Sequence, residues 1–295
     1  MFLQQTEFVN CPLCNKNRYK KKYKIETWQI VQCRHCSLVY VNPRLKKTEL
    51  LRLYEENYFD NVSVGYYHYT ENKHLRKKNF HKWLTDALPF INTNSNVKAL
   101  DIGCAAGYCL EIFKCFGWES FGIELDSNLT NTLKTKGFTV YNEPLQQLTD
   151  ISKFSVITMF DVIEHLTDLQ ENMKKLNSLL QDDGILIMVT PDYSSFQRKI
   201  FRKNWFQFKP VEHINYFTID TLRHLANIHG FEIIKSKKAG QFCDVSFLKN
   251  RLKKYRLHFL LPIFGIFVKL LFLKDRVVYM DTASLYLVMR KKATD

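Results

Sequence analysis

Between residues 73 and 292, short apolar runs alternate with segments whose apolar residues recur every three or four positions. The runs, bounded by turn residues, predict buried strands, and the recurring spacing predicts helices. The predicted strands are 97–102, 120–123, 138–141, 154–159, 185–190, 231–235 and 282–289. The predicted helices are 46–56, 73–88, the segment after Gly107, 127–136 (capped by Ser127), 164–181 and 218–229. This alternation predicts an α/β fold, a Rossmann-like, doubly wound sheet.

The turn after the first strand of this region reads Asp101-Ile-Gly-Cys-Ala-Ala-Gly107. Gly103 and Gly107 let the backbone approach a ligand closely, and the next helix offers free N–H groups. About 20 residues later Glu124 closes the second strand, where a carboxylate can bind both hydroxyls of a ribose. The spacing predicts a nucleoside site. The turn is not G-x-G-x-x-G, and an acid at 101 suits a cationic ligand better than a pyrophosphate.

Asp101-x-Gly103-x-x-x-Gly107 resembles the S-adenosylmethionine (SAM) loop of class I methyltransferases, with Ala105 at the middle glycine. Segments 154–166, 184–192 and 212–233 resemble later parts of that family. The resemblance covers 97–292 and implies a seven-stranded sheet whose last strand is antiparallel. It also implies that residues 144–147 lie near the adenine. The expected cofactor contacts are Asp101, Gly103, Cys104, Ala105, Gly107, Glu124, Leu125, Leu145 and Asp161.

Four cysteines near the N-terminus form two pairs, Cys11-Pro-Leu-Cys14 and Cys33-Arg-His-Cys36, with 18 residues between them. This spacing predicts a closed, structural zinc site, and hence a zinc ribbon over 1–45. Two disulfides are the alternative, which the absence of a secretory pattern disfavours. The other cysteines, expected to be buried free thiols, are Cys104, Cys109, Cys115 and Cys243.

The order of ribbon, Asn42-Pro43-Arg44, a helical and Tyr-rich segment (46–96) and a SAM domain resembles a bacterial subgroup. That subgroup is associated with the modification of sugars, cell-surface glycans or secondary metabolites. The resemblance implies a small-molecule or glycan-pathway acceptor: a sugar, a nucleotide-sugar or a lipid-linked intermediate. The ribbon and the stretch 58–69 would then form a lid over the acceptor.

An oxygen or carbon acceptor must lose a proton, and histidine is the usual base near pH 7. His165 and His213, with Asp161, are the candidate catalytic residues. Asp161, Glu164 and His165 also stand at i, i+3 and i+4, and with His213 they would form a divalent-metal site. This arrangement resembles that of certain metal-dependent RNA and quinone-precursor O-methyltransferases. The alternative, which we favour, places Asp161 on the cofactor or acceptor, Glu164 at the helix N-terminus, and His165 in packing or as the base.

The 295 residues carry a net charge of +14, which suggests an anionic partner without identifying it. Basic clusters lie at 15–24, 197–209 and 250–256. The first two clusters would bind the phosphate backbone of a nucleic acid, with nearby aromatic residues stacking on its bases, or they form a solvated surface. If the acceptor is a small molecule, residues 198–209 would instead bind a substrate phosphate. Residues 250–273 are interpreted either as a peripheral anchor at the inner face of a membrane or as a buried part of an insertion at 245–276. No segment reads as a transmembrane helix, and we expect a cytoplasmic protein.

Three functions follow. The leading one is a SAM-dependent methyltransferase with a structural zinc ribbon. The second is a metal-dependent RNA or O-methyltransferase that uses Asp161, Glu164, His165 and His213. The third is a non-catalytic scaffold whose ribbon binds a partner.

Overall fold

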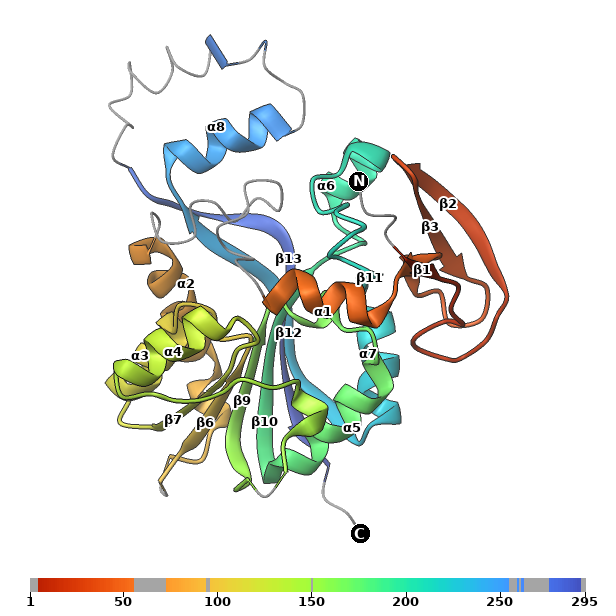
Figure 1. The fold of residues 1–295 in the computed structure, drawn as a ribbon. Helices are drawn as coiled ribbons and strands as arrows, with labels where there is room; N and C mark the ends of the chain where they lie inside the picture. Colours follow the sequence, from red (N-terminus) through yellow and green to blue (C-terminus); the bar gives the residue numbers. More distant parts are fainter. Residues whose placement is uncertain are drawn as a thin grey trace.

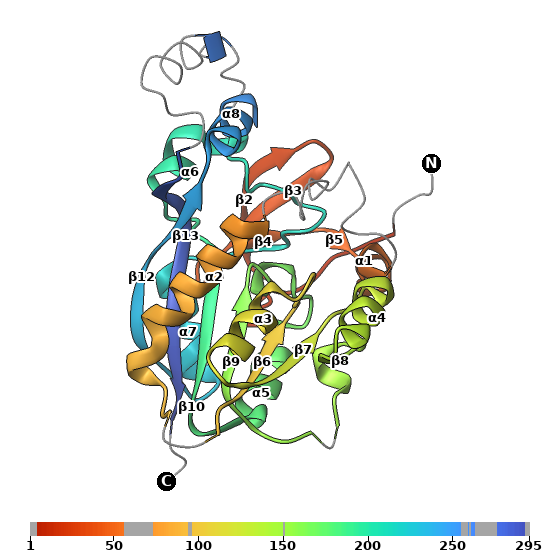
Figure 2. The same cartoon turned by 90° about the vertical axis from the view of Figure 1, so that its left-hand side faces the viewer.

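The computed structural model describes residues 5–55, 73–93, 96–149, 151–254, 259, 261–262 and 276–292. Its centre is a seven-stranded sheet with helices on both faces (Figures 1 and 2). In spatial order the strands are β12 (Phe231–Cys243), β13 (Val278–Lys291), β10 (Leu180–Pro191), β9 (Phe154–Phe160), β6 (Lys98–Ile102), β7 (Glu119–Ile123) and β8 (Thr139–Tyr141). β13 runs antiparallel to both neighbours, whereas β10, β9, β6, β7 and β8 are mutually parallel. The predicted doubly wound fold, with its last strand antiparallel, is confirmed.

Two apolar layers cover the sheet. One face carries α2 (Lys73–Ala87), α3 (Tyr108–Cys115) and α4 (Ser127–Thr135), which bury Trp83, Phe113 and Leu133. The other face carries α5 (Leu169–Leu179) and α7 (Ile219–Ile228), which bury Met173 and Leu222. The helices therefore close both faces and leave the strand ends open for a site.

The local sequence explains most helix boundaries. Thr218 caps the N-terminus of α7 through a capping box. Gly230, with a φ of +70°, follows the C-terminus of this helix and ends it, as predicted. The predicted cap of α4 is wrong by one residue. The Asp126 carboxylate accepts the backbone N–H groups of Asn128 and Leu129, so Asp126, and not Ser127, is the cap.

The predicted helix over 164–181 is wrong in its first turn. A single 3-10 turn, η4 (Ile163–His165), is followed by non-helical residues before α5 begins at Leu169. The carbonyl oxygens of Leu166 and Thr167 accept hydrogen bonds from the side chains of Asn215 and Arg44. These bonds take the place of the backbone hydrogen bonds of a helical turn. Asp161 precedes η4 at φ +55°, so it does not share a helix face with Glu164 and His165.

The strands β12 and β13 are longer than predicted. They pair from Phe231↔Lys291 to Cys243↔Val278, well beyond the expected 231–235 and 282–289. The added part of β12 begins with Ser236, Lys237 and Lys238 and continues through Gly240 and Gln241, so it has no apolar run that would predict a strand. This extension carries the chain over the carboxyl ends of the central strands (Figure 1).

The N-terminal residues form a second sheet whose strands are β2 (Tyr19–Ile25), β3 (Trp28–Cys33), β4 (Val39–Val41) and β11 (Asn215–Tyr216). Nearby, β1 (Thr6–Glu7) pairs with β5 (Arg44–Leu45). β11 comes from the connection between β10 and α7, so one strand of this sheet belongs to the distant part of the sequence. Between β10 and β11 lie α6 (Phe196–Phe201) and η5 (Arg202–Asn204). Trp205 and Phe208, two aromatic residues of the basic cluster 197–209, are buried against the second sheet and are not available to stack on a nucleic acid.

Several predictions fall partly or wholly outside the described residues. The Tyr-rich stretch 58–69 lies outside them, as does most of the apolar run 257–273, so membrane contact through 250–273 stays a prediction. α8 (Val245–Lys254) forms the start of the predicted insertion, and α1 (Lys47–Glu55) and η2 (Leu88–Phe90) lie within 46–96. Across the described ranges, no helix combines the length and apolar character needed to cross a membrane. Cys104, Cys109 and Cys243 are buried free thiols, but Cys115 is exposed, contrary to expectation.

Candidate functional site

The loop between β6 and α3 is held in an unusual backbone conformation. Gly103, Ala105 and Gly107 have φ values of +70°, +47° and +77°. A Cβ atom at Gly103 would stand 2.9 Å from Val162, and one at Gly107 would stand 2.4 Å from a methyl group of Leu133. The backbone N–H groups of Gly103 and Cys104 both donate to the Ile123 carbonyl oxygen at 2.9 Å. Both glycines are therefore required, whereas Ala105 is held at a φ that favours glycine.

Glu124, at the end of β7, is fixed by this loop. Its Oε2 accepts the Ala105 N–H at 2.8 Å, and its Oε1 accepts the Asp126 N–H at 2.9 Å. Burial raises the pKa of Glu124, and the two backbone N–H groups oppose that rise. A carboxylate has about four lone-pair positions, so both oxygens can still accept further hydrogen bonds from a diol.

Asp101 supports the loop from inside. Its carboxyl group is buried and accepts a hydrogen bond from the Thr158 hydroxyl. Burial raises its pKa to about 7, and the Thr158 hydrogen bond works against that rise. Asp101 does not line the cavity described below, so its predicted direct contact with the cofactor is not supported by this arrangement.

A cavity of about 340 Å³ opens at the carboxyl ends of β6, β7 and β9. The predicted site residues that line it are Gly103, Ala105, Glu124, Leu125, Leu145, Asp161 and His165. Leu145 belongs to η3 (Leu145–Gln147), and the segment 144–146 predicted near the adenine lines the cavity too. Cys104, Gly107 and His213 are absent from its described lining, and so are residues 198–209. The expected meeting of 198–209 with a substrate phosphate therefore has no support here.

Glu164, His165 and His213 meet beside this cavity. Each offers a ligand atom within 4.8 Å of the others, and the two imidazole centroids are 4.8 Å apart at 89°. Glu164 accepts a hydrogen bond from the Thr190 hydroxyl through Oε2, and its buried Oε1 has no hydrogen-bond partner among the described residues. Asp161 is not part of this group, so three of the four expected metal ligands come together.

Both histidines are fixed by backbone carbonyl groups. His213 donates from Nδ1 to the Gln207 carbonyl oxygen at 3.0 Å, and His165 is hydrogen-bonded to the backbone of Glu212. Burial lowers the pKa of His165 to about 3 and that of His213 well below its ordinary value. Both rings are therefore neutral at pH 7, and each keeps one nitrogen lone pair, which suits a metal ligand better than a strong base.

The four N-terminal cysteines form a compact cluster with all sulfur atoms within 4.8 Å of one another. The Cys11–Cys36 and Cys14–Cys33 sulfur distances are 3.4 and 3.5 Å, and all four are free thiols. Zinc–sulfur bonds of about 2.3 Å place the sulfur atoms of a tetrahedron about 3.8 Å apart. The cluster fits a zinc ion, and the four cysteines are free thiols and not the two disulfides of the disfavoured alternative.

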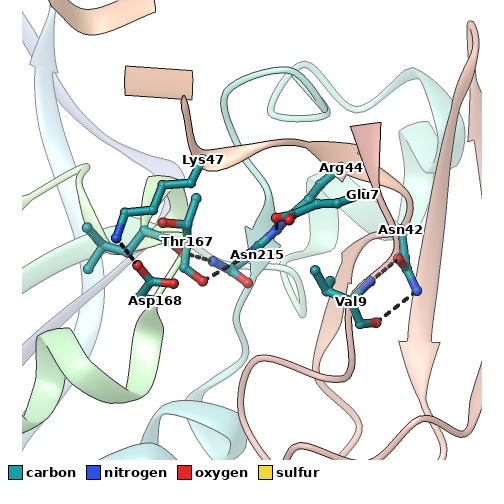
Figure 3. Close-up of polar contacts among 9 residues, drawn as sticks. Glu7, Val9, Asn42, Arg44, Lys47, Thr167, Asp168 and Asn215 are labelled. Atoms are coloured by element: carbon teal, nitrogen blue, oxygen red, sulfur yellow. Dashed lines mark hydrogen bonds and ion pairs between the residues drawn. The ribbon is translucent and has the colours of Figure 1, made fainter. Parts of the chain in front are cut away.

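A polar interface joins the N-terminal residues to the segment after η4 (Figure 3). Arg44 donates to Glu7 at 3.0 Å and to the Thr167 carbonyl oxygen at 2.9 Å, and Lys47 pairs with Asp168. Gln170 donates to the carbonyl oxygens of Pro12 and Leu13, which belong to the first cysteine turn. No local sequence pattern indicates this interface, because its two sides lie more than 100 residues apart in the chain.

Comparisons with known proteins show which family the chain resembles. A family model described as a methyltransferase domain matches residues 49–236. Ubiquinone biosynthesis O-methyltransferase of Rhodopseudomonas palustris (strain HaA2) is 24% identical over 160 residues, 50% of this chain and 62% of that protein. The protein of that name from Glaesserella parasuis serovar 5 (strain SH0165) is 30% identical over 120 residues, 35% of this chain and 50% of that one. The chain spans 50 to 62% of the length of these two curated relatives.

Solved structures resemble the fold. Magnesium protoporphyrin IX methyltransferase from Synechocystis PCC 6803, with bound SAH, has a TM-score of 0.53 and 15% identity, covering 84% of this chain and 100% of that one. A SAM-dependent methyltransferase from Archaeoglobus fulgidus has a TM-score of 0.51 and 18% identity, covering 76% and 100%. At these identities the likeness concerns the fold alone.

Proposed function

The chain belongs to the methyltransferase domain family, and on this premise we propose that it transfers a methyl group from SAM to an acceptor. The observation that carries the proposal is the Glu124 carboxylate, fixed by the Ala105 N–H at the wall of the cavity. The predicted turn, the following carboxylate and the segment 144–146 all line one cavity, as a nucleoside site requires.

SAM, when bound, supplies a methyl group activated by a sulfonium. The backbone of Gly103 and Ala105 would border its methionine part, Glu124 and Leu125 its ribose, and Leu145 its adenine. Asp101, Cys104 and Gly107 hold the loop in shape from behind. Asp161 and His165, on the remaining wall, would orient the acceptor, and the neutral His165 ring would accept a hydrogen bond from the acceptor's reacting group.

For the acceptor we propose a small molecule or a glycan-pathway intermediate, which is a sugar, a nucleotide-sugar or a lipid-linked intermediate. The subgroup resemblance supports a glycan-pathway role, and the curated relatives carry the name ubiquinone biosynthesis O-methyltransferase. An RNA acceptor is less well supported, because the aromatic residues Trp205 and Phe208 are buried. The four-cysteine cluster would hold a structural zinc ion, since four thiolates leave no open coordination position.

A second candidate is metal-dependent methyl transfer. The unpartnered Glu164 Oε1, with the lone pairs of two oriented histidines, supports a divalent ion at Glu164, His165 and His213. Dialysis against a chelator would then remove a metal distinct from the zinc, and His213→Gln would abolish its binding. Replacement of the exposed His224 by Gln is the matched control. Metal analysis of the three proteins separates the two candidates.

Isothermal titration of the full chain tests the main proposal. We expect SAM and S-adenosylhomocysteine to bind with micromolar affinity and NAD not to bind. Absence of heat with both sulfur nucleosides would contradict the proposal and favour the scaffold function.

A further inference from the structure

One part of the same cavity is lined mainly by apolar side chains from outside the loops after β6, β7 and β8. We call it the α2–β12 compartment, and it is lined by Leu50, Leu51, Leu75, Phe80, Trp83, Phe160, Phe242 and Phe247. These side chains come from α1, α2, β9, β12 and α8, whereas the proposed SAM contacts come from the loops after β6, β7 and β8. The compartment therefore adjoins the proposed methyl-donor site without being part of it.

An aromatic cluster forms the floor of this compartment next to the strand ends. Phe80 stacks on Phe160 with centroids 5.4 Å apart and planes at 14°, and Trp83 lies 5.2 Å from Phe160. Phe160 is the last residue of β9 and directly precedes Asp161. The apolar floor thus begins beside the residue that would orient the acceptor.

The polar side chains of the compartment are largely engaged by the chain itself. Asn79 accepts the Phe242 N–H at 2.6 Å and donates to the Phe242 carbonyl oxygen, and Trp83 donates to the Gly240 carbonyl oxygen at 3.1 Å. Asp244 accepts hydrogen bonds from Ser246 and from the Phe247 N–H. These groups shape the wall and are not placed to bind the many hydroxyls of a bare sugar.

Arg76 and Gln241 also line the wall, so the compartment suits a ligand with one polar end and an apolar body. A bare hexose would lose water from its hydroxyl groups here without full replacement, whereas a ring or a hydrocarbon chain would gain from burial.

We infer that the acceptor carries an apolar body, an aromatic ring or a hydrocarbon chain, that occupies the α2–β12 compartment. This inference rests on the proposed methyl transfer and names the substrate class of the same site. It narrows the glycan-pathway acceptors to lipid-linked ones and admits phenolic acceptors.

The test uses the full chain saturated with S-adenosylhomocysteine, titrated with two probe series. One consists of 4-methyl-, 4-butyl- and 4-hexylphenol, and the other of methyl, butyl and hexyl β-glucoside. We expect affinity to rise about two- to fourfold per methylene in at least one series, and the stronger series identifies a phenolic or a lipid-linked sugar acceptor.

Two variants localise the effect. The double variant Leu51→Ser/Phe247→Ser should lower the affinity for the hexyl probe about tenfold and leave S-adenosylhomocysteine binding unchanged. Phe196→Ser, on exposed α6, should change neither. Affinity independent of chain length in both series, or an unaffected double variant, would overturn the inference. Failure of S-adenosylhomocysteine to bind the unmodified chain would instead refute the proposed function.

Discussion

Arg44 donates a hydrogen bond from Nη1 to the Thr167 carbonyl oxygen at 2.9 Å. Thr167 lies two residues after His165, so this bond ties the N-terminal residues to the turn that carries a candidate catalytic side chain. The same guanidinium donates to Glu7, and Arg44 is buried. Arg44 does not line the cavity itself, but it holds the backbone of Thr167, which does.

Replacement of Arg44 by Ala should destabilise the protein by about 2–3 kcal/mol, since hydrogen bonds of charged groups contribute about 1.5–3 kcal/mol each. It should also lower methyl transfer more than it lowers SAM affinity, because the displaced turn carries His165. Urea denaturation and isothermal titration measure the two effects. Arg52→Ala, which removes an exposed ion pair with Glu49 on α1, should change the free energy of unfolding by less than about 0.5 kcal/mol. Equal stability of both variants would contradict the structural role.

Ala105→Gly should stabilise the protein by about 1 kcal/mol, because an L-residue at φ +47° is strained and glycine is not. The neighbouring Ala106 does not have a positive φ, so Ala106→Gly should be neutral or destabilising. The free energies of unfolding of both variants, compared in the same buffer, check the prediction. A loss of stability in Ala105→Gly would show that its Cβ packing outweighs the strain.

Asp101 should make stability fall as pH rises. Burial raises its pKa to about 7 in the folded protein, against about 3.9 in an unfolded chain. Between these values the folded protein keeps a proton that the unfolded chain loses, so the free energy of unfolding decreases with pH. Asp101→Asn removes this dependence, and its stability relative to the unmodified chain should rise by roughly 1–3 kcal/mol from pH 5 to pH 8.

The control for Asp101→Asn is Asp220→Asn, an exposed carboxylate on α7. Its stability should follow that of the unmodified chain across the same pH range. A constant difference between Asp101→Asn and the unmodified chain would mean that Asp101 is ionised throughout.

Zinc removal should unfold the N-terminal sheet. We expect about one zinc ion per chain by mass spectrometry, and Cys33→Ser should lose it and lower the melting temperature. Cys115→Ser, at an exposed thiol outside the cluster, should retain the metal and the melting temperature. Full zinc content in Cys33→Ser would exclude the four-cysteine site.

Glu124→Gln should weaken SAM binding at least tenfold. The substituted amide can accept through one oxygen only, and its NH₂ group would face a backbone N–H of Ala105 or Asp126. Glu119→Gln, an exposed residue at the start of β7, removes the same charge away from the cavity. Isothermal titration should show unchanged SAM affinity for that control. Equal affinities for both variants would exclude Glu124 from the ribose site.

The sequence predicted the sheet because each central strand is a continuous apolar run bounded by turns. The prediction of secondary structure was wrong where side chains from distant segments replace the backbone hydrogen bonds of a helix. The turn around His165 is one example, since Arg44 and Asn215 take the carbonyl groups that a longer α5 would have used. The α2–β12 compartment was also missed, because its residues come from five elements and no single motif contains them. Their long-range contacts have no local pattern.

The pairing of β11 has a consequence for chimeric proteins in which the N-terminal residues are exchanged. Its residues Asn215 and Tyr216 pair with Tyr40 and Val39 of β4, and Ile214 accepts the Val41 N–H. A chimera that exchanges only the first 45 residues between two relatives would separate a four-stranded sheet from one of its strands. The N-terminal sheet and the stretch around β11 therefore form one structural unit, although nearly 170 residues stand between them in the chain.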